Sequence, residues 1–226
     1  MKLIDLCIVS GVIELLSGGR IGGSDDMLQI GGTDLTVIRD PASGRPYLPG
    51  SSVKGKMRSS LELELGKLSG NEPCRCGAAD CPICRVFGPH KNSSHSLGPT
   101  RIIVHDAALC EGTAFAIENK VESVNNRSVG TAMHPRTVER IAPGARFNFT
   151  VGLRVFDSDE NFKYTDKDGN DVVGKNALLE VVYHGMDLLE ALGIGAGTGK
   201  GYGQLRIVDD KASWGNLRRR RAVKVS

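Results

Sequence analysis

Alternating apolar and polar positions predict four strands. Residues 3–16, 101–105 and 204–208 each show this alternation and are expected to be the first, second and last strands. Alternation is strictest between 147 and 155, which is expected to be a half-buried strand. Its apolar positions are Phe147, Phe149, Val151, Leu153 and Val155.

Two further segments repeat at the spacing of an amphipathic helix. Pro49 and Gly50 form a turn, and Ser51 or Ser52 is expected to supply the N-cap of the first helix. Gly193 is expected to end the second helix. The repeating positions are Val53, Met57, Leu61, Leu65 and Leu68 in the first helix, and Leu178, Val182, Met186, Leu189 and Leu192 in the second.

This order of strands and helices fits an α+β fold with a ferredoxin-like (RRM-like) β-α-β-β-α-β core. One domain is expected to span 1–226, with long insertions. A cysteine-rich insertion covers 70–90, and the polar stretch 118–141 is expected to be a projecting hairpin or loop. The segment 157–170, rich in Asp, Lys and Gly, is expected to be a loop.

Composition excludes some classes of function. The chain has 29 Lys and Arg against 26 Asp and Glu, a net charge of +3 that permits nucleic-acid binding without requiring it. Its apolar runs are far shorter than the roughly 20 residues needed to cross a bilayer, and its first residues lack a signal-peptide pattern, so a cytoplasmic protein is expected. Aromatic residues are 5% of the chain, so any grip on RNA is expected to use phosphate contacts and backbone amides. The run Arg218–Arg221 is either a solvated tail or a contact for nucleic acid.

Four cysteines lie within eleven positions, at Cys74, Cys76, Cys81 and Cys84. Four thiolates at about 2.3 Å would close the shell of a tetrahedral, structural zinc ion. Two alternatives stay open: zinc with His90 or another ligand in place of one cysteine, and a disulfide or redox pair. Cys7 and Cys110 fall in predicted strands and are expected to be small core residues.

The glycine-rich segment 193–203 does not fit a nucleotide-binding template. A Walker loop would need glycine at Ile194 and Ser or Thr at Gly201. The segment also follows a helix and precedes a strand, the reverse of a dinucleotide fold. Either it brings its amides and Lys200 close to phosphates, or it is a flexible turn.

Six segments in this order together resemble one family. They are 18–24, 31–34, 39–58, 87–88, 135–140 and 193–203. The chain resembles the backbone subunit of type III-A CRISPR effectors, within the RAMP superfamily, and a type III-D relative stays open. Arg20 stands where that family often has histidine, and one extra residue separates Arg127 from Pro135.

The resemblance implies a palm, a thumb hairpin at 118–141 and a filament of copies along a guide RNA. The thumb would displace a base pair of the guide–target duplex at regular intervals. Asp34 would then be the catalytic residue beside the exposed target phosphate, with Mg²⁺ or Mn²⁺ as the catalytic metal and zinc as the structural one. The rival acids are Asp25, Asp26 and Asp40, and Asp40 is expected to mark a turn before Pro41.

The resemblance also implies which residues bind RNA. Lys54, Lys56 and Arg58 would contact the guide backbone, and all three could do so only if the first of them precede the helix. Arg140 is a weaker candidate in the thumb. The full set is Arg20, Ser51, Ser52, Lys54, Lys56, Arg58, Arg127, Arg136, Gly197, Gly199 and Lys200.

The partners implied are guide RNA, target RNA, further copies of the chain and other effector subunits, with no membrane. Three other functions stay open. One is a structural subunit that does not cleave RNA, which would be indicated if the Asp34→Ala variant still cut guide-paired RNA at the regular interval. Another is a guide-processing ribonuclease, although none of the five histidines lies in the expected early loop. The last is a zinc module unrelated to RNA, which would lack salt-dependent RNA binding.

Overall fold

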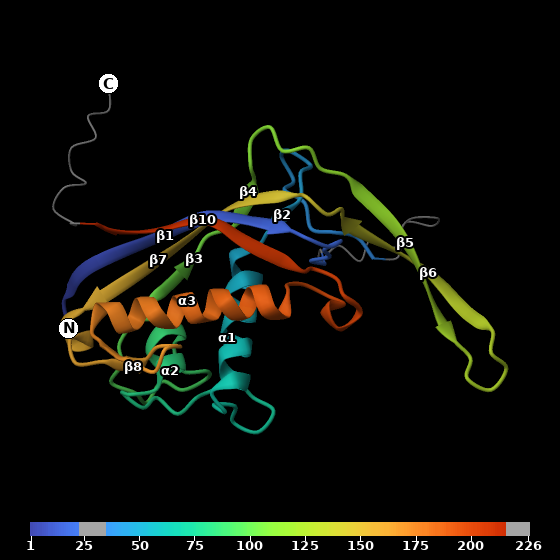
Figure 1. Ribbon diagram of the computed structural model, residues 1–226. Helices are drawn as coiled ribbons and strands as arrows, with labels where there is room; N and C mark the ends of the chain where they lie inside the picture. Colours follow the sequence, from blue (N-terminus) through green and yellow to red (C-terminus); the bar gives the residue numbers. More distant parts are fainter. Residues whose placement is uncertain (23–34, 216–226) are drawn as a thin grey trace.

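The computed structural model describes residues 1–22 and 35–215. In this part of the chain, a six-stranded antiparallel sheet has the order β10-β1-β7-β4-β2, with β3 also paired to β7 (Figure 1). Two smaller sheets pair β5 with β6 and β8 with β9. The strands are β1 Leu3–Leu15, β2 Tyr47–Leu48, β3 Ile102–Val104, β4 Ala107–Leu109, β5 Ile117–Asn125, β6 Ala132–Ile141, β7 Arg146–Phe156, β8 Lys163–Thr165, β9 Asp171–Val173 and β10 Leu205–Gly215.

Two long helices cover one face of the main sheet. These helices, α1 (Gly50–Glu64) and α3 (Lys175–Leu192), pack against each other beneath the strands in Figure 1. A shorter helix, α2 (Pro82–Phe87), and two 3-10 turns, η1 (Asp157–Asp159) and η2 (Thr198–Lys200), complete the elements. No described helix covers the opposite face of the sheet.

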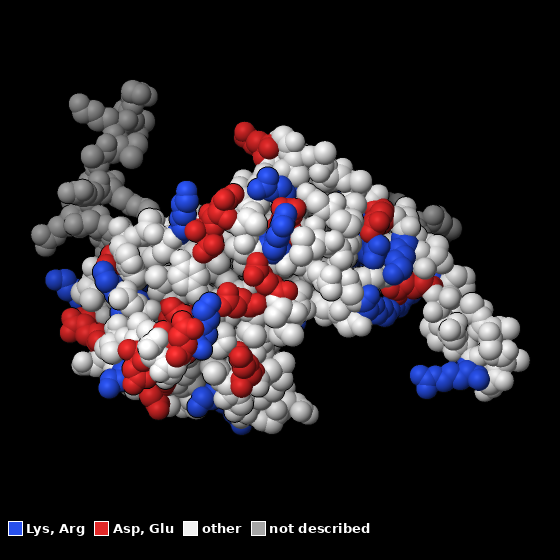
Figure 2. Space-filling model, viewed as in Figure 1, with Lys and Arg blue, Asp and Glu red and all other residues white. Residues whose placement is uncertain are grey.

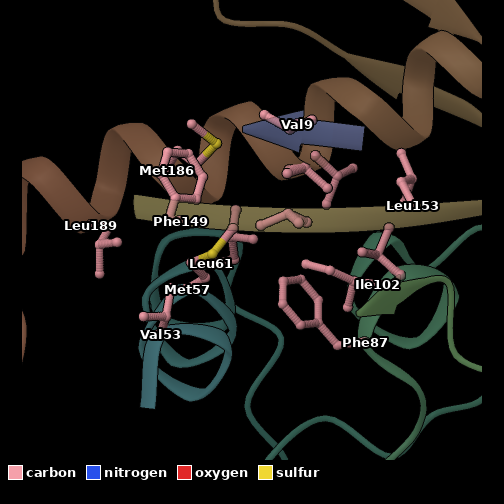
Figure 3. Packing of buried hydrophobic residues seen from close by; sticks show 14 of the residues in the cluster. Val9, Val53, Met57, Leu61, Phe87, Ile102, Phe149, Leu153, Met186 and Leu189 are labelled. Carbon is pink, nitrogen blue, oxygen red and sulfur yellow. The ribbon is translucent and has the colours of Figure 1, made fainter. Parts of the chain in front are cut away.

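The hydrophobic core lies between the sheet and these helices (Figure 3). Met57 and Leu61 of α1, Met186 and Leu189 of α3, and Phe149 of β7 all belong to this core. All five alternating apolar residues of β7 are almost completely buried. The sequence prediction for this strand is confirmed, because the period of two places every second side chain in the core.

The other predicted strands are also present, although their lengths differ. β3 has only three residues, whereas β10 continues to Gly215 because it pairs with β1 as far as Leu6. The prediction of a loop over 157–170 is partly wrong. Phe162 and Tyr164 are buried there, and Tyr164 belongs to β8, which pairs with β9.

Both ends of α1 differ from the prediction. The helix begins at Gly50, and Ser51 and Ser52 lie in its first turn, so neither serine is the N-cap. The carboxylate of Asp106 accepts a hydrogen bond from the Gly50 N–H at 2.7 Å and replaces the expected serine cap. A side chain at position 50 would collide with the carbonyl of Val104, so glycine permits this close approach.

The C-terminus of α1 comes one turn earlier than the apolar spacing predicts. Gly66 has φ +61° and its N–H bonds to the Leu63 carbonyl, while the Lys67 N–H bonds to the Glu62 carbonyl at 2.8 Å. This pair of bonds is a Schellman motif. Leu68 therefore lies outside the helix, and 42% of its side chain is exposed.

β5 and β6 form a hairpin that projects from the body of the molecule (Figure 1). Its register shifts between Glu122 and Val124, opposite Met133 and Arg136. His134 has φ +51° at this irregularity, and Pro135 follows it. A bulge accommodates a proline in a strand because the missing N–H is not required there.

No described helix is both long and apolar enough to pass through a lipid bilayer.

Candidate nucleic-acid interface and metal centre

A groove lies where the β5–β6 hairpin leaves the body. It consists of two adjoining cavities, of about 400 Å³ along the hairpin and about 70 Å³ beneath it. Glu122, Arg136 and Lys200 line both cavities. The smaller cavity is also lined by Arg20, Leu35, Val138, Ala196, Gly197 and Tyr202. Four of the predicted RNA-binding residues, Arg20, Arg136, Gly197 and Lys200, are therefore brought together.

Glu122 is the acceptor at the centre of this groove. Its carboxylate receives hydrogen bonds from Arg136 Nη2 at 3.0 Å, from Lys200 Nζ at 2.9 Å and from the hydroxyl of Tyr202. These donors, with the Tyr202 hydroxyl first, lower the pKa of Glu122 from 4.5 to about 2. Glu122 is therefore ionised at neutral pH and holds both cations.

Two further cations contact the ring of Tyr202. Lys120 Nζ is 4.5 Å and Arg140 Cζ is 4.4 Å from the ring centroid. Tyr202 is buried, with 3% of its surface exposed. Cation–π contacts of this kind join the hairpin to the glycine-rich segment.

The glycine-rich segment packs against the first glycine loop. The Ala196 N–H bonds to the Arg20 carbonyl at 2.8 Å, and the Gly203 N–H bonds to the Gly18 carbonyl at 3.0 Å. Gly195 has φ +86°, and a β-carbon there would collide with the Arg20 carbonyl. The N–H groups of Ala196 and Gly203 therefore bind backbone carbonyls of the protein and are not available to phosphates. The prediction that amides of this segment bind phosphates does not hold for these two. Gly199 is exposed.

The cations of α1 form a separate group. Lys54, Lys56 and Arg58 all lie inside the helix. For all three to contact RNA, the first of them would have to precede the helix, and this requirement is not met. Arg58 is tied within the protein, because its Nε bonds to Glu62 at 2.8 Å and its Nη2 bonds to the Cys74 carbonyl at 2.9 Å.

Lys54 is half-buried next to other cations. Burial, and then the charges of Arg58 and Arg154, lower the pKa of Lys54. Ser51 is exposed and Ser52 is half-buried in the first turn of the helix. The structure does not bring these α1 residues into the groove beneath the hairpin.

Arg127 lies in the exposed turn between β5 and β6, away from the groove. Figure 2 shows basic and acidic side chains together where the hairpin leaves the body. The outer part of the hairpin is largely uncharged in this view. Val121, Val124, Val129 and Met133 of the hairpin are exposed at 64%, 66%, 69% and 40%. These side chains make the hairpin unusually apolar for an exposed element.

The predicted catalytic residue, Asp34, lies outside the described residues, as do its rivals Asp25 and Asp26 and the run Arg218–Arg221. Asp40 is described: it accepts hydrogen bonds from the Ser43 N–H at 2.7 Å and the Ser43 hydroxyl at 2.8 Å. These bonds, the hydroxyl's first, lower the pKa of Asp40. The prediction that Asp40 forms a turn is confirmed.

The four predicted cysteines form a compact cluster that could bind a structural metal ion. Their sulfur atoms all lie within 4.8 Å of one another, and the hydrogen-bonding pairs are separated by 3.6 to 3.8 Å. A tetrahedron with metal–sulfur distances of about 2.3 Å has edges of about 3.8 Å, so the donor set fits zinc. Disulfide bonds of about 2.0 Å are excluded for these cysteines.

His90 is not part of this sulfur cluster. Its Nε2 lies 3.2 Å from a carboxylate oxygen of Glu72. Of the two other cysteines, Cys7 is fully buried in β1, as predicted. Cys110 is only half-buried just past β4, where its sulfur contacts Asn148, so its assignment to the core is wrong.

A buried hydrogen bond and buried ion pairs attach the cysteine cluster to the body. Glu62 of α1 accepts a hydrogen bond from the Cys74 N–H at 2.8 Å. Arg85 of α2 contacts Asp159 at 3.2 Å, and Asp159 also binds the fully buried Arg101 at 2.7 Å. The metal site is therefore connected to both α1 and the sheet.

Sequence reasoning missed Glu122 and Tyr202. Glu122 falls within the polar stretch 118–141, and Tyr202 within the glycine-rich segment 193–203. A tyrosine among glycines and an acid in the predicted hairpin were the available signals. Their pairing across 80 residues could not be read from local sequence.

Comparison with known proteins shows the family to which the chain belongs. Residues 12–206 match the RAMP superfamily, and the chain belongs to this superfamily. The CRISPR system Cms endoribonuclease Csm3 of Methanothermobacter thermautotrophicus is 38% identical over 224 residues, covering 90% of this chain and 84% of that protein. The protein of the same name from Methanocaldococcus jannaschii is 39% identical over 215 residues, covering 90% and 79%.

Two solved structures share the fold. The Csm3-Csm4 subcomplex of the type III-A CRISPR-Cas interference complex matches with a TM-score of 0.61 and 28% identity, over 96% of this chain and 83% of that chain. A chain of the type III-B Cmr-beta complex bound to cognate target RNA matches with a TM-score of 0.59 and 20% identity, over 92% and 61%.

Proposed function

We propose that this chain is the backbone subunit of a type III CRISPR effector. It binds guide RNA, oligomerises along it with other effector subunits, and cleaves the paired target RNA at regular intervals in the cytoplasm. The observation that carries this proposal is the groove beneath the hairpin, which collects Arg20, Arg136 and Lys200 next to Leu35. Leu35 directly follows Asp34 in the chain. The similarity to proteins named endoribonuclease Csm3 supports the same function.

The architecture supports a ferredoxin-like palm. The strand order β10-β1-β7-β3, with α1 after β1 and α3 after β7, is the order expected of a β-α-β-β-α-β unit. The hairpin over 118–141 is the thumb, and the segment 70–90 is the metal-binding insertion. The exposed apolar side chains of the hairpin suit contact with bases that are displaced from a duplex.

RNA binding uses two surfaces of the subunit. Arg20, Arg136, Lys200 and Gly197 contact phosphates in the groove, together with the exposed Gly199, and Arg127 acts from the hairpin turn. Ser51, Ser52, Lys54 and Lys56 contact the guide backbone from α1, and Arg58 supports them by joining α1 to the cysteine segment. Such contacts read charge and shape, so base pairing by the guide supplies sequence specificity.

Asp34 is the catalytic residue of this proposal. A target nucleotide that is splayed out of the duplex can align its 2′-hydroxyl with the neighbouring phosphorus, which a continuous A-form helix prevents. Arg20, Arg136 and Lys200 hold the strand in that geometry. A Mg²⁺ or Mn²⁺ ion held with the help of Asp34 would stabilise the charge that develops on the phosphate.

Zinc is the metal of the cysteine cluster in this proposal. Four sulfur ligands leave no open position for water, so the ion is structural and not catalytic. It stabilises an insertion that is too small to bury a core of its own.

The experiment is target cleavage by the reconstituted effector complex with Asp34→Asn or Asp34→Ala in this subunit. Both variants should assemble on guide RNA and lose cleavage of the paired target. Asp40→Asn is the matched control, because Asp40 only closes a turn, and it should cleave at the wild-type positions. Intact, regularly spaced cleavage by Asp34→Ala would show that the subunit is structural or that another acid is catalytic.

A further inference from the structure

Among the residues that the structure describes, one acid lines the groove together with several cations. Of these described lining residues of the two cavities, Glu122 alone is acidic, whereas Lys120, Arg136, Lys200 and Arg20 are basic. The exposures of the paired side chains differ. Only 13% of the Glu122 side chain is exposed, against 53% of Arg136 and 57% of Lys200. The carboxylate therefore lies beneath two cations whose outer sides remain open.

Glu122 also connects three segments that are distant in the sequence. It belongs to β5, Arg136 belongs to β6, and Lys200 and Tyr202 belong to the segment that follows α3. Each cation has donors to spare, because arginine has five N–H groups and lysine three. Both can bind the carboxylate and an RNA phosphate at the same time.

We propose that Glu122 is a positioning residue that holds Arg136 and Lys200 side by side as a two-cation clamp for the ribose-phosphate backbone of RNA. This inference rests on the proposed RNA-binding function. Long basic side chains lose rotamer freedom when they bind a phosphate, and a resident carboxylate restricts that freedom before RNA arrives. Tyr202 keeps the carboxylate in place through its hydroxyl.

Positioning and simple electrostatics make opposite predictions for Glu122→Gln. Removal of a negative charge from a cationic groove should by itself tighten RNA binding. If the carboxylate positions the cations, the same substitution should weaken binding. The glutamine amide can still accept from Tyr202, so the hairpin remains attached to the body.

The test is the affinity of the full-length chain for a fluorescein-labelled single-stranded RNA, measured by fluorescence anisotropy over a series of salt concentrations. Lys200→Met and Arg136→Met should each weaken binding and reduce the salt slope, by about 0.7 per lost phosphate contact. Glu122→Gln should weaken binding about tenfold without reducing the salt slope, because both cations remain. Glu139→Gln is the matched control, since Glu139 is also a hairpin acid but pairs with Arg39 outside both cavities.

A double-variant cycle separates positioning from a general effect on structure. In the Lys200→Met, Arg136→Met background, Glu122→Gln should no longer weaken binding, and the loss of its negative charge should leave the affinity equal or slightly tighter, because neither of the two clamp cations is left to position. Thermal unfolding of each variant identifies any that do not fold. If Glu122→Gln does not fold, Tyr202→Phe takes its place. It keeps the ring that contacts Lys120 and Arg140, removes one restraint on the carboxylate, and should weaken RNA binding several-fold.

The outcomes also separate this inference from the function on which it rests. If the two cation variants weaken binding but Glu122→Gln binds RNA as tightly as wild type or more tightly, the positioning role is refuted and the groove stands. The positioning role is also refuted if Glu122→Gln weakens binding by the same factor in the Lys200→Met, Arg136→Met background as in the wild-type chain. If neither cation variant changes affinity or salt slope, the groove does not bind RNA and the proposed function of these residues fails.

Discussion

Asp159 is expected to be one of the most important side chains for stability. It is fully buried in η1, and its carboxylate accepts hydrogen bonds from Arg85 at 3.2 Å, from Arg101 at 2.7 Å and from the Phe156 N–H at 2.9 Å. Asp159→Asn preserves the shape of the side chain but removes its charge. Arg101, which is 0% exposed, would then be a buried cation without its counter-ion.

The expected loss can be worked out from this geometry. Removing one partner of a buried ion pair costs about 3–5 kcal/mol, because the remaining charge is desolvated without compensation. Arg101 keeps hydrogen bonds to the carbonyls of Leu97 and Pro99, which favours the lower half of that range. A domain has a total stability of about 5–15 kcal/mol, so the substitution removes a large share of it.

Urea denaturation of the full-length chain measures this loss. With a slope of about 2–3 kcal/mol/M, the midpoint should fall by about 1–2 M. Asp157→Asn is the control, because Asp157 lies in the same 3-10 turn, is 46% exposed and pairs with the N-terminal amine at 3.8 Å. It should shift the midpoint far less than Asp159→Asn does, because an exposed ion pair contributes little. A loss below about 1 kcal/mol for Asp159→Asn would refute the reasoning that the two arginines depend on this carboxylate.

Two further predictions concern the metal centre and the groove. Chelation of the metal should lower the melting temperature of the protein. Cys81→Ala should have the same effect and His90→Ala should not, since only the cysteine belongs to the sulfur cluster. Metal content by mass spectrometry checks this, and an equal loss of metal in His90→Ala would contradict the four-cysteine assignment. For Glu122, the folded pKa of about 2 lies below the ordinary value of 4.5, so its stabilising effect is fully present above about pH 4.5 and is lost as pH falls toward 2. The difference in melting temperature between wild type and Glu122→Gln should therefore be constant from pH 7 to about 5 and shrink below that, and a difference that is independent of pH down to 2 would rule out the ion pairs as its source.

Much of the fold could be predicted because it depends on local patterns. The alternation over 147–155 determines which face of β7 is buried, and helical spacing with Gly193 defines α3 and its end. Four cysteines within eleven positions can reach one ion without help from the rest of the chain. In each case the residues that decide the structure are close in sequence.

Other features could not be predicted because their partners are distant. The start of α1 depends on Asp106, which is 56 residues away from Gly50. Arg58 was predicted to bind RNA, and its contacts with Glu62 and the Cys74 carbonyl were not foreseen. A cation on a helix has the same sequence signature whether its partner is a phosphate or a carboxylate.

The sequence by itself determined the long strands β1, β7 and β10, the two long helices, the cysteine cluster and the family. Only the tertiary structure decided that Glu122, Arg136 and Lys200 share one groove, since 78 residues separate Glu122 from Lys200. Periodicity and motif spacing act over a few residues. The geometry of an ion-pair network across two segments is fixed only when both pack on the same sheet.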